Sequence, residues 1–374
     1  PFDHRVYIIA GDGCMQEGVT SEAASLAGTQ NLGNIIAIYD DNRISIEDNT
    51  SIAFNEDVMK RFEAYGWHTQ KVSWINEDGT YVEDVDALND ALNNAEAEVT
   101  KPSIIQLSTI IGAPTPGKQD TGGIHGAKLG DPALRDLKTT LGMDPDKMFE
   151  VDEKVIEHAR ANAAKRAEKA REKWDVAFRE WAEANPEGVK LLDRIRSGAL
   201  PEGLADALPS FEAGKAVATR AASGKVINAL APVMPELWGG SADLAGSNNT
   251  FMAGEPSFIP EERSSKAFSG NIFGRNLHFG VREHGMGAIM NGIAADGLTR
   301  VYGATFFVFA DYMRGAVRLA ALMNLPVTYV WTHDSIGVGE DGPTHQPVEH
   351  LAAYRAMPNL AMVRPGDADE TAQA

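Results

Sequence analysis

Short apolar runs alternate with helix-length amphipathic stretches along most of this chain. Residues 5–10 form an apolar run, a helical pattern covers about residues 15–31, and residues 35–39 form a second apolar run. A strand, a helix and a strand joined by short connections form a βαβ unit, which requires parallel strands. Further strand-like runs at residues 69–72 and 103–109 extend the pattern. The first half is therefore predicted to be a parallel sheet flanked by helices.

A second alternation of the same kind fills the other half of the chain. Strand-like runs at residues 237–240, 301–307 and 327–332 each follow a helical pattern. Alternating strands and helices predict another mostly parallel sheet covered by helices. The fold class is therefore α/β, with two domains that each contain a mostly parallel sheet.

Length and composition indicate how the two domains are divided. A chain of 374 residues is too long for one compact core. Residues 185–211 carry several Pro and Gly and little periodicity, which is typical of a linker. We therefore expect one domain over residues 1–184 and another over residues 212–374. A long helical pattern over residues 152–184 is expected to pack its apolar face on the first domain.

Charge and cysteine content exclude several classes of protein. A formal net charge of -19 argues against a nucleic-acid-binding surface. No run approaches the roughly 20 apolar residues that a membrane helix needs, so we expect no membrane partner. Cys14 is the only cysteine, which excludes an intramolecular disulfide and favours the reducing cytoplasm. An anionic substrate would need a locally basic pocket.

Polar residues follow the first two predicted strands at the point where each strand ends. Asp12 lies in a Gly-Asp-Gly turn after the first run, and Asn42 follows the second, 30 residues later. In a parallel sheet these ends share one edge, where ligands bind. A carboxylate, an amide oxygen and a nearby backbone carbonyl are hard donors suited to Mg²⁺ or Ca²⁺. Gly13 would let a phosphorylated ligand approach the backbone, although Gly-Asp-Gly alone also forms ordinary turns.

Two segments around these residues resemble a known family. Residues 11–18 (GDGCMQEG) and 39–46 (YDDNRISI) resemble the thiamine diphosphate motif of transketolases. The resemblance implies a diphosphate-binding first domain and a pyrimidine-binding second domain. It also implies that Asp12, Asn42 and the backbone carbonyl of Ile44 bind a divalent metal, Mg²⁺ or in its place Ca²⁺ or Mn²⁺. Gly13 would then touch the diphosphate.

The second half carries residues that match the family's pyrimidine site. Residues 280–286 (GVREHGM) precede an apolar helix, where an acid could simply cap the helix start. In the family the counterpart of Glu283 bonds the pyrimidine ring and promotes removal of the cofactor's C2 proton. Phe306, Phe309 and Tyr312 follow at helical spacing, which alone is typical of a core. The resemblance implies an aromatic pocket in which Phe309 stacks on the pyrimidine.

The densest group of polar residues follows the strand-like run at residues 327–332. Residues 332–347 (THDSIGVGEDGPTHQP) hold two His and several acids in a Gly-rich loop. Buried polar groups need hydrogen-bond partners, so packing alone does not explain this loop. The stretch resembles the transketolase signature, which implies that His333 and His345 contact substrate oxygens and act in catalysis. Asp341 would accept a hydrogen bond from the sugar's C2 hydroxyl.

The remaining family matches are single residues. Arg220 and Ser247 match the family's pair for the substrate phosphate, although Arg220 alone would read as a surface charge. His125 matches a histidine near the diphosphate and the reacting centre, where it would serve cofactor, substrate and catalysis. Glu17 and Glu22 match acids at the family's dimer interface.

The resemblance implies a transferase of the pentose phosphate pathway. We expect a transketolase that moves a two-carbon ketol unit from a ketose phosphate, such as xylulose 5-phosphate, to an aldose phosphate, such as ribose 5-phosphate. It would be a cytoplasmic homodimer with thiamine diphosphate at the subunit interface. Dihydroxyacetone synthase, 1-deoxyxylulose 5-phosphate synthase and a non-catalytic protein with the same fold are the alternatives.

Both ends of the chain fall inside expected elements. It begins almost at once in an apolar run and stops in what looks like the first turn of a helix. We therefore expect an internal fragment that lacks the family's N-terminal segment and C-terminal domain. Such a fragment is expected to be inactive alone, with an exposed sheet edge at residues 6–10.

Overall fold

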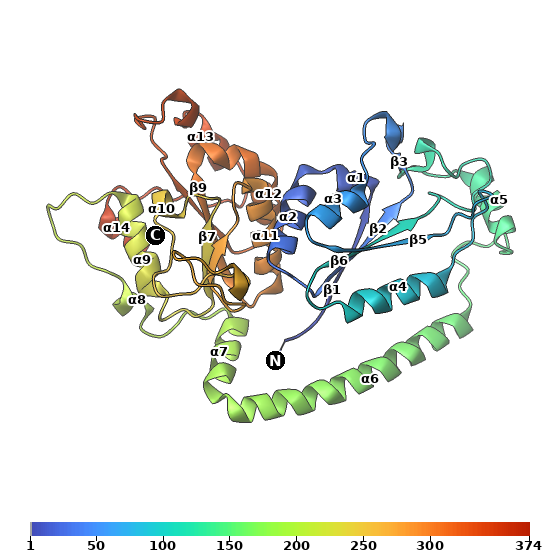
Figure 1. The fold of residues 1–374 in the computed structure, drawn as a ribbon, viewed down its shortest axis with the longest axis horizontal. Coiled ribbons are helices and arrows are strands. Elements are labelled where there is room, and N and C mark those ends of the chain that lie inside the picture. The colour runs from blue at the N-terminus through green and yellow to red at the C-terminus, as the bar shows by residue number, and fades with distance from the viewer. Residues whose placement is uncertain (1) are drawn as a thin grey trace. The chain divides into compact units, whose positions relative to one another are not determined.

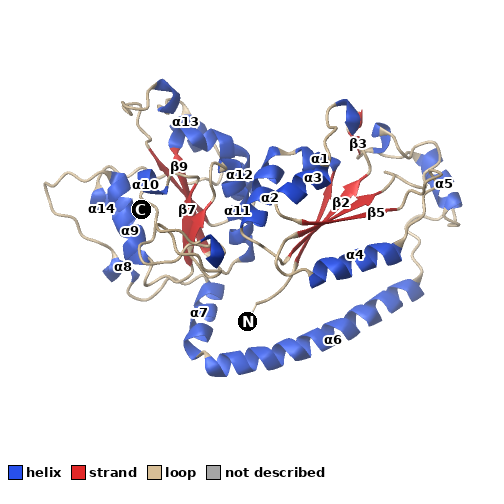
Figure 2. Cartoon of the chain, viewed as in Figure 1, coloured by secondary structure: helices blue, strands red, loops and turns tan. Residues whose placement is uncertain are grey.

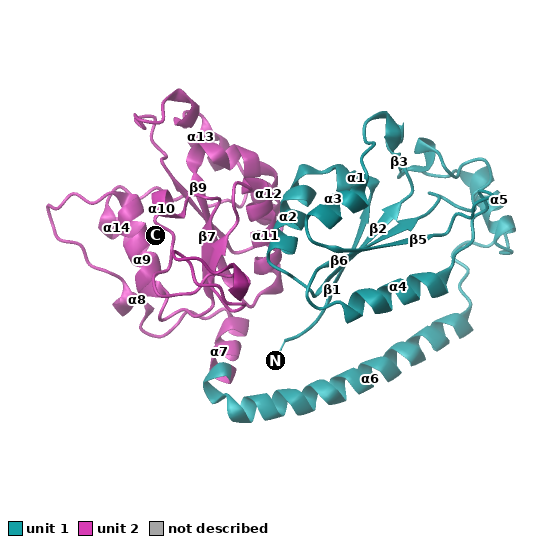
Figure 3. Cartoon of the chain, in the orientation of Figure 1, with its two compact units in different colours: residues 1–188 teal, residues 189–374 magenta. Residues whose placement is uncertain are grey.

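The computed structural model describes residues 2–374. The chain forms two compact units, and the division along the sequence falls between Gly188 and Val189 (Figure 3). Each unit contains a four-stranded sheet in which all neighbouring strands are parallel. The predicted α/β class with two mostly parallel sheets is therefore confirmed. The finer limits of a diphosphate-binding and a pyrimidine-binding domain stay a prediction.

The sheet of unit 1 has the strand order β1-β2-β6-β5 (Figure 1). Its strands are β1 (Val6–Gly11), β2 (Ile35–Asp41), β5 (His68–Ser73) and β6 (Ser103–Ser108). The helices of unit 1 are α1 (Asp12–Gln16), α2 (Gly18–Thr29), α3 (Val58–Ala64), α4 (Val85–Ala97), α5 (Asp131–Thr140) and α6 (Glu153–Ala184). Its short elements are β3 (Ile44–Ser45), β4 (Asp48–Asn49), η1 (Thr50–Ile52) and η2 (Gly122–Ile124).

Strand alternation divides the core of unit 1 into two layers. In β2, Ile36 packs with residues of α4, whereas Ala37 and Tyr39 pack with residues of α1, α2 and α3. Successive side chains of a strand point to opposite faces, so an all-apolar strand buries both. Helices therefore cover both faces of the sheet (Figure 2). This packing fixes the carboxyl ends of β1 and β2, where the candidate site lies.

Strand β1 is the exposed edge of this sheet, as the sequence predicts. It pairs only with β2 among the described strands. Apolar side chains on both of its faces are exposed, from Ile8 at 41% to Ile9 at 80%. Exposed apolar edge strands promote association between chains.

Helix α6 corrects one expectation. It begins after Asp152, whose carboxylate accepts a hydrogen bond from the backbone N–H of Lys154, and continues for 32 residues. None of its residues is buried, so the expected packing of an apolar face on the domain is wrong. Its large rings contact one another instead, because Phe178 stacks on Trp174 and also meets Trp181. The segment predicted as a linker, residues 185–211, contains two further helices.

The sheet of unit 2 has the strand order β10-β9-β7-β8. Its strands are β7 (Leu237–Ser241), β8 (Asn276–His278), β9 (Arg300–Phe306) and β10 (Val327–Thr332). The helices are α7 (Pro186–Ser197, which spans the division between the units), α8 (Leu204–Ala207), α9 (Thr219–Leu230), α10 (Ala245–Asn248), α11 (Glu283–Asp296), α12 (Arg314–Leu322), α13 (His350–Arg355) and α14 (Ala368–Gln373). Three 3-10 turns are η3 (Glu261–Arg263), η4 (Phe307–Met313) and η5 (Pro343–His345).

The central strand β9 carries the core of unit 2. Tyr302 packs with Ile227 of α9 on one face. On the other face, a Cβ added to Gly303 would lie 2.4 Å from the sulfur of Met290, so α11 lies close against the sheet. Close packing of α11 fixes its first residue, Glu283, relative to the end of β9. Among residues 2–374, every helix is too short or too polar to cross a membrane.

Candidate functional site

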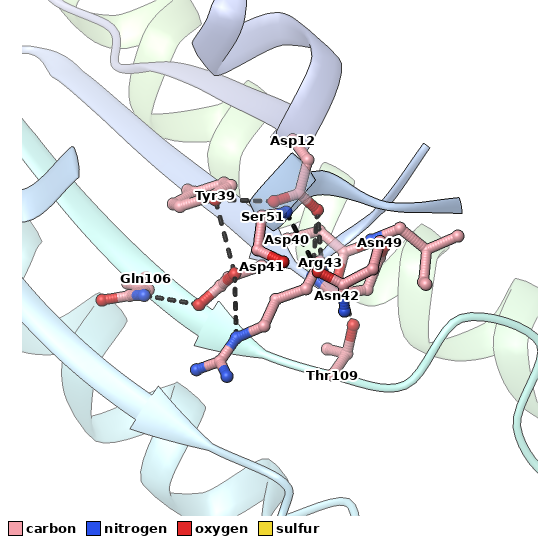
Figure 4. A network of polar contacts seen from close by, with 11 residues as sticks. Asp12, Tyr39, Asp40, Asp41, Asn42, Arg43, Asn49, Ser51, Gln106 and Thr109 are labelled. Carbon is pink, nitrogen blue, oxygen red and sulfur yellow. Dashed lines mark hydrogen bonds and ion pairs between the residues drawn. The ribbon is translucent and has the colours of Figure 1, made fainter. Parts of the chain in front are cut away.

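The Asp12 carboxylate organises the carboxyl ends of β1 and β2 in unit 1 (Figure 4). It is 3% exposed. One oxygen accepts hydrogen bonds from the backbone N–H groups of Asn42 (3.2 Å) and Arg43 (3.0 Å), and the other accepts one from the Tyr39 hydroxyl (2.8 Å). Arg43 adopts a left-handed backbone (φ 61°), which turns its N–H toward Asp12. The structure thus brings together Asp12 and Asn42, the two residues that the strand ends were expected to join.

Further acids surround this carboxylate. Asp41 is buried and accepts a hydrogen bond of 2.5 Å from the Gln106 amide. Asp40 accepts hydrogen bonds from Thr109 and, at 3.2 Å, from the Asn42 amide. The Arg43 guanidinium lies 4.0 Å from Asp41 and is largely exposed, so it offsets little of this negative charge.

The electrostatics of this cluster suit a cation. Burial, and then repulsion from Asp41, raises the pKa of Asp12, although the hydrogen bonds from Tyr39, Arg43 and Asn42 act against this rise. Burial and the neighbouring carboxylates also raise the pKa of Tyr39, so its hydroxyl stays a donor. A divalent cation would relieve the cost of burying the Asp12 charge.

The oxygen donors have capacity for such an ion. The Asn42 side-chain oxygen accepts one hydrogen bond, from the Ile44 backbone N–H at 3.0 Å, and an amide oxygen can accept two. Ile44 is itself buried. The Asp12 carboxylate, the Asn42 amide oxygen and the Ile44 main-chain carbonyl are hard donors of the kind that Mg²⁺ or Ca²⁺ prefers. The residues present therefore fit the predicted ion.

Space for a ligand is found beside these donors. A Cβ added to Gly13 would meet no heavy atom within 4 Å, so the protein leaves room there. An open pocket next to the acids is lined by residues at strand ends, including Asp41, Ser73 and Ser108. Asp120, from the loop between β6 and α5, also lines the pocket.

The other predicted residues of unit 1 lie on its surface or partly covered. His125 follows η2 and is exposed, and its side chain forms no hydrogen bond with another described residue. Its loop is attached to the β3–β4 hairpin through the Gly122 N–H, which lies 3.3 Å from the Asp48 carboxylate. Glu17 is exposed and precedes α2, in which Glu22 is half-buried.

Unit 2 gathers the predicted rings at the carboxyl ends of β9 and β10. Phe306 lies nearly parallel to Phe309, with ring centroids 5.7 Å apart, and stacks on His333 at 3.8 Å. His345 meets the edge of Phe309 at 5.2 Å, and Tyr312 lies 6.1 Å from Phe309. All five predicted ring residues therefore form one cluster, which we call the ring cluster.

A chain of hydrogen bonds orients His333 within this cluster. The Arg220 guanidinium lies 3.4 Å from Nε2 of His333, and Nδ1 lies 2.9 Å from the Thr332 hydroxyl. The Thr332 hydroxyl donates to the Asn248 amide oxygen at 2.7 Å. Arg can only donate, so Nε2 accepts and Nδ1–H donates to Thr332. This network assigns the Nδ1-protonated tautomer and leaves Nε2 as the acceptor.

The backbone and charge of His333 are also unusual. It adopts a left-handed conformation (φ 52°), which is uncommon for residues other than glycine and is concentrated at functional sites. Burial and then the Arg220 charge lower its pKa, while Asp341 and Asp334 act in the opposite direction. His333 is therefore neutral at pH 7 and can accept a proton.

Arg220 links the ring cluster to the predicted phosphate residues. Its guanidinium donates to the backbone carbonyl of Ser247 at 3.1 Å. The side chains of Arg220, Ser247 and Asp341 are exposed. Two predicted phosphate ligands therefore lie together beside His333, and Asp341 acts on that histidine through its charge.

Glu283 is the first residue of α11 and is half-buried. The helix dipole stabilises a negative charge at this position. Helix α11 packs against η4, the turn that carries Phe309, because a Cβ added to Gly287 would lie 2.8 Å from the Ala316 side chain and 3.2 Å from Met313. Helix α11, which begins at Glu283, is therefore held against the turn that carries part of the ring cluster.

Sequence reasoning missed the residues that orient the predicted ones. Tyr39 and Gln106 hold the acids of unit 1, and Thr332 and Asn248 orient His333. A signal for Tyr39 existed, because strand alternation places it on the same face as Asp41 and a buried hydroxyl needs a partner. No comparable signal marked Asn248, which lies 84 residues before Thr332.

Two family models match the chain in succession. The model described as "Transketolase, thiamine diphosphate binding domain" matches residues 1–201, and the model described as "Transketolase, pyrimidine binding domain" matches residues 215–374. The first match covers the unit that holds Asp12 and Asn42, and the second covers the ring cluster.

Known proteins with similar sequences are transketolases. The chain is 56% identical over 375 residues to a transketolase of Mycobacterium tuberculosis and 48% identical over 372 residues to one of Geobacillus stearothermophilus. Each alignment covers 100% of this chain but only 52% and 53% of the relative. The chain thus spans about half the length of the curated relatives it matches.

Solved structures give the same result. The Pichia stipitis transketolase in complex with sedoheptulose 7-phosphate matches with a TM-score of 0.91 and 44% identity, covering 99% of this chain and 53% of that one. The transketolase of Leishmania mexicana matches with a TM-score of 0.90 and 42% identity over the same shares. In sequence, in fold and in the order of its two halves, this chain belongs to the transketolase family.

Proposed function

We propose that this chain forms the cofactor-binding part of a transketolase that moves a two-carbon ketol unit from a ketose phosphate to an aldose phosphate. The observation that carries the proposal is the ring cluster, in which His333 and His345 lie against Phe306 and Phe309 with Arg220 beside them. A flat apolar surface, a neutral proton acceptor and a cation are the groups that a ring-shaped cofactor and a sugar phosphate require. The similarity to transketolases over the whole chain supports this reading.

The metal site is proposed at Asp12, Asn42 and the backbone carbonyl of Ile44. The Asp12 side chain is already held in place by three hydrogen bonds, so it needs no rearrangement to bind an ion. Mg²⁺ is the expected ion, and Ca²⁺ or Mn²⁺ could take its place because all three accept oxygen ligands. Gly13 would allow a diphosphate to reach that ion, and His125 would approach from the loop after β6.

The ring cluster is proposed as the site of the pyrimidine ring, with Phe309 stacked on it and Phe306 and Tyr312 forming the sides. When bound, thiamine diphosphate supplies the nucleophilic carbon that carries the two-carbon unit. Glu283 would hydrogen-bond the pyrimidine ring, because its half-buried carboxyl at the start of α11 is partly shielded from water.

The proposed substrate residues of unit 2 are two members of the ring cluster, His333 and His345, together with Arg220, Ser247 and Asp341. Arg220 and Ser247 would hold the substrate phosphate, since a guanidinium pairs two oxygens of such an anion. His333 is neutral, so its Nε2 can accept a proton from a sugar hydroxyl once Arg220 turns toward the phosphate. His345 and Asp341 would hold further sugar oxygens.

A homodimer is also proposed, with Glu17 and Glu22 at its interface and the cofactor between subunits. The support is the family resemblance at both acids and the division of the expected cofactor residues between two units. We propose that the enzyme acts in the pentose phosphate pathway in the cytoplasm, which agrees with an exposed free thiol at Cys14.

The experiment is a transfer assay on the complete gene product that carries this sequence. Xylulose 5-phosphate and ribose 5-phosphate are supplied with thiamine diphosphate and Mg²⁺, and sedoheptulose 7-phosphate is measured. Wild-type protein should form it, and an R220Q variant should show a raised KM for both substrates while still binding the cofactor. Failure of the wild type to form sedoheptulose 7-phosphate, when it binds the cofactor normally, would refute the transketolase proposal.

A further inference from the structure

A second group of metal-ligating side chains lies in unit 2, apart from the residues given a role above. His350 begins α13, Glu349 precedes it, and Asp311 lies in η4. One nitrogen or oxygen from each of the three lies within 4.8 Å of those of the other two. Nε2 of His350 is 3.0 Å from the Asp311 carboxylate, and Nδ1 is 3.8 Å from the Glu349 carboxylate.

The imidazole of His350 is buried without a hydrogen bond. The residue is 3% exposed and packs beside the ring of Phe307, with centroids 5.5 Å apart. Neither ring nitrogen has a hydrogen-bond partner, because the Asp311 oxygen is close but lies off the direction of the ring N–H. Buried polar groups nearly always have partners, so an unpaired imidazole beside two carboxylates requires an explanation.

We propose that His350, Asp311 and Glu349 bind one divalent transition-metal ion of the Zn²⁺ class. Zinc bonds to nitrogen and oxygen are about 2.0–2.2 Å long, so neighbouring ligand atoms in its tetrahedral shell lie roughly 3.3–3.6 Å apart. The 3.0 Å between His350 and Asp311 is a few tenths of an ångström shorter, so a small movement of the exposed Asp311 side chain reaches that separation. An imidazole ligand selects Zn²⁺ over Mg²⁺ and Ca²⁺, which prefer oxygen alone.

The two acids can move to meet the ion. The side chains of Asp311 and Glu349 are 55% and 74% exposed, whereas His350 is fixed by its packing. Glu349 now lies nearest Nδ1, so a rotation of its side chain brings it to the Nε2 side. Water would complete the coordination shell, as in sites with three protein ligands.

The position gives this ion a consequence that rests on the proposed function. Asp311 lies between Phe309 and Tyr312 in η4, so an ion held by Asp311 and His350 restrains the turn that carries the proposed pyrimidine pocket. Binding of Zn²⁺ itself does not depend on that function.

The test is Zn²⁺ calorimetry on the complete, chelator-treated gene product, with millimolar Mg²⁺ present to occupy the oxygen site around Asp12. We expect one Zn²⁺ per chain in unit 2. The variants D311N and H350A should each lower the affinity by more than about tenfold. H158A is the matched control, because His158 is an exposed histidine on α6 with Asn162 as its neighbour, and it should leave the affinity unchanged.

Two further measurements keep the result decisive. H350A removes a buried ring and could unfold unit 2, so D311N, which changes an exposed carboxylate, is compared with it by circular dichroism. Co²⁺ in place of Zn²⁺ should give visible absorption bands that D311N abolishes. Zn²⁺ binding that is absent from the wild type, equal in folded D311N, or abolished by excess Mg²⁺ overturns the proposal. A wild-type protein that binds Zn²⁺ but forms no sedoheptulose 7-phosphate in the transfer assay would count against the proposed function and leave the Zn²⁺ site standing.

Discussion

Replacing Tyr39 with Phe should loosen the acidic network without changing the packing of the ring. The Tyr39 hydroxyl donates to Asp12 at 2.8 Å and lies 3.4 Å from Asp41, and both acids are buried. A hydrogen bond to a charged group contributes about 1.5–3 kcal/mol. The variant Y39F should therefore lower the free energy of opening this segment by about that amount. The second, longer contact adds little.

Hydrogen exchange followed by mass spectrometry measures that opening directly. Asp12 binds the backbone N–H groups of Asn42 and Arg43, so their exchange reports on the network. A loss of about 1.5–3 kcal/mol makes exchange roughly tenfold to hundredfold faster. Y65F is the matched control, because Tyr65 packs against the same core and its hydroxyl bonds to no described residue.

The pH dependence gives the sign of the effect. The Tyr39 hydrogen bond lowers the pKa of Asp12 against the larger effect of burial, so Y39F should raise that pKa further. The destabilisation should be full above the Asp12 pKa and shrink as the pH falls through it, because a protonated acid needs the donor less. Equal exchange in Y39F and wild type at neutral pH, or an equal effect of Y65F, would refute this reasoning.

Three other predictions concern residues of both units. R194M should destabilise unit 2 by about 1.5–3 kcal/mol in thermal unfolding, because buried Glu236 loses the guanidinium that donates to it at 2.7 and 2.8 Å and keeps only Arg300 at 3.7 Å. Burial alone would raise the pKa of Glu236, but the Arg194 hydrogen bonds lower it overall, so this stability is present at neutral pH and is lost as the pH falls through the lowered pKa; an unchanged melting temperature would contradict it. R220Q should raise the pKa of His333 by removing a nearby positive charge, and an NMR titration that shows no rise would count against the assigned contact. I9K should reduce the aggregation of the 374-residue chain, as measured by light scattering, because Ile9 is 80% exposed on an edge strand. If a folded I9K variant aggregates as much as the unchanged chain, this edge is not the cause.

Most of the regular structure could be predicted from periodicity and boundary residues. The expected strands over residues 103–109 and 327–332 match β6 and β10. The helix expected over about residues 15–31 is instead two helices, α1 and α2, separated at Glu17, whose backbone is extended. An extended residue between two helical patterns leaves no mark in hydrophobic periodicity.

The packing of α6 could not be predicted in the same way. Its apolar stripe resembles that of a helix that covers a sheet, but its aromatic residues contact one another on an exposed helix. Periodicity shows that a face exists, and only tertiary structure shows what covers it.

For the candidate site, too, the sequence indicated the residues but not the contacts between them. Family resemblance and strand ends indicated Asp12, Asn42 and His333, and the structure adds the contacts that hold them. Those contacts join residues far apart in sequence, such as Asn248 and Thr332, through side chains whose pairing depends on the fold. The tautomer of His333 and the unpaired imidazole of His350 likewise follow only from three-dimensional neighbours.

The central claim is that this chain carries a metal-dependent thiamine diphosphate site, and calorimetry of the complete gene product tests it most directly. Wild-type protein should bind thiamine diphosphate with Mg²⁺ present and lose most of that affinity when Mg²⁺ is removed. D12N should bind weakly in both conditions, whereas D175N, which changes an exposed acid on α6, should behave like the wild type. Tight binding that is equal with and without Mg²⁺, or unchanged in D12N, would contradict the account.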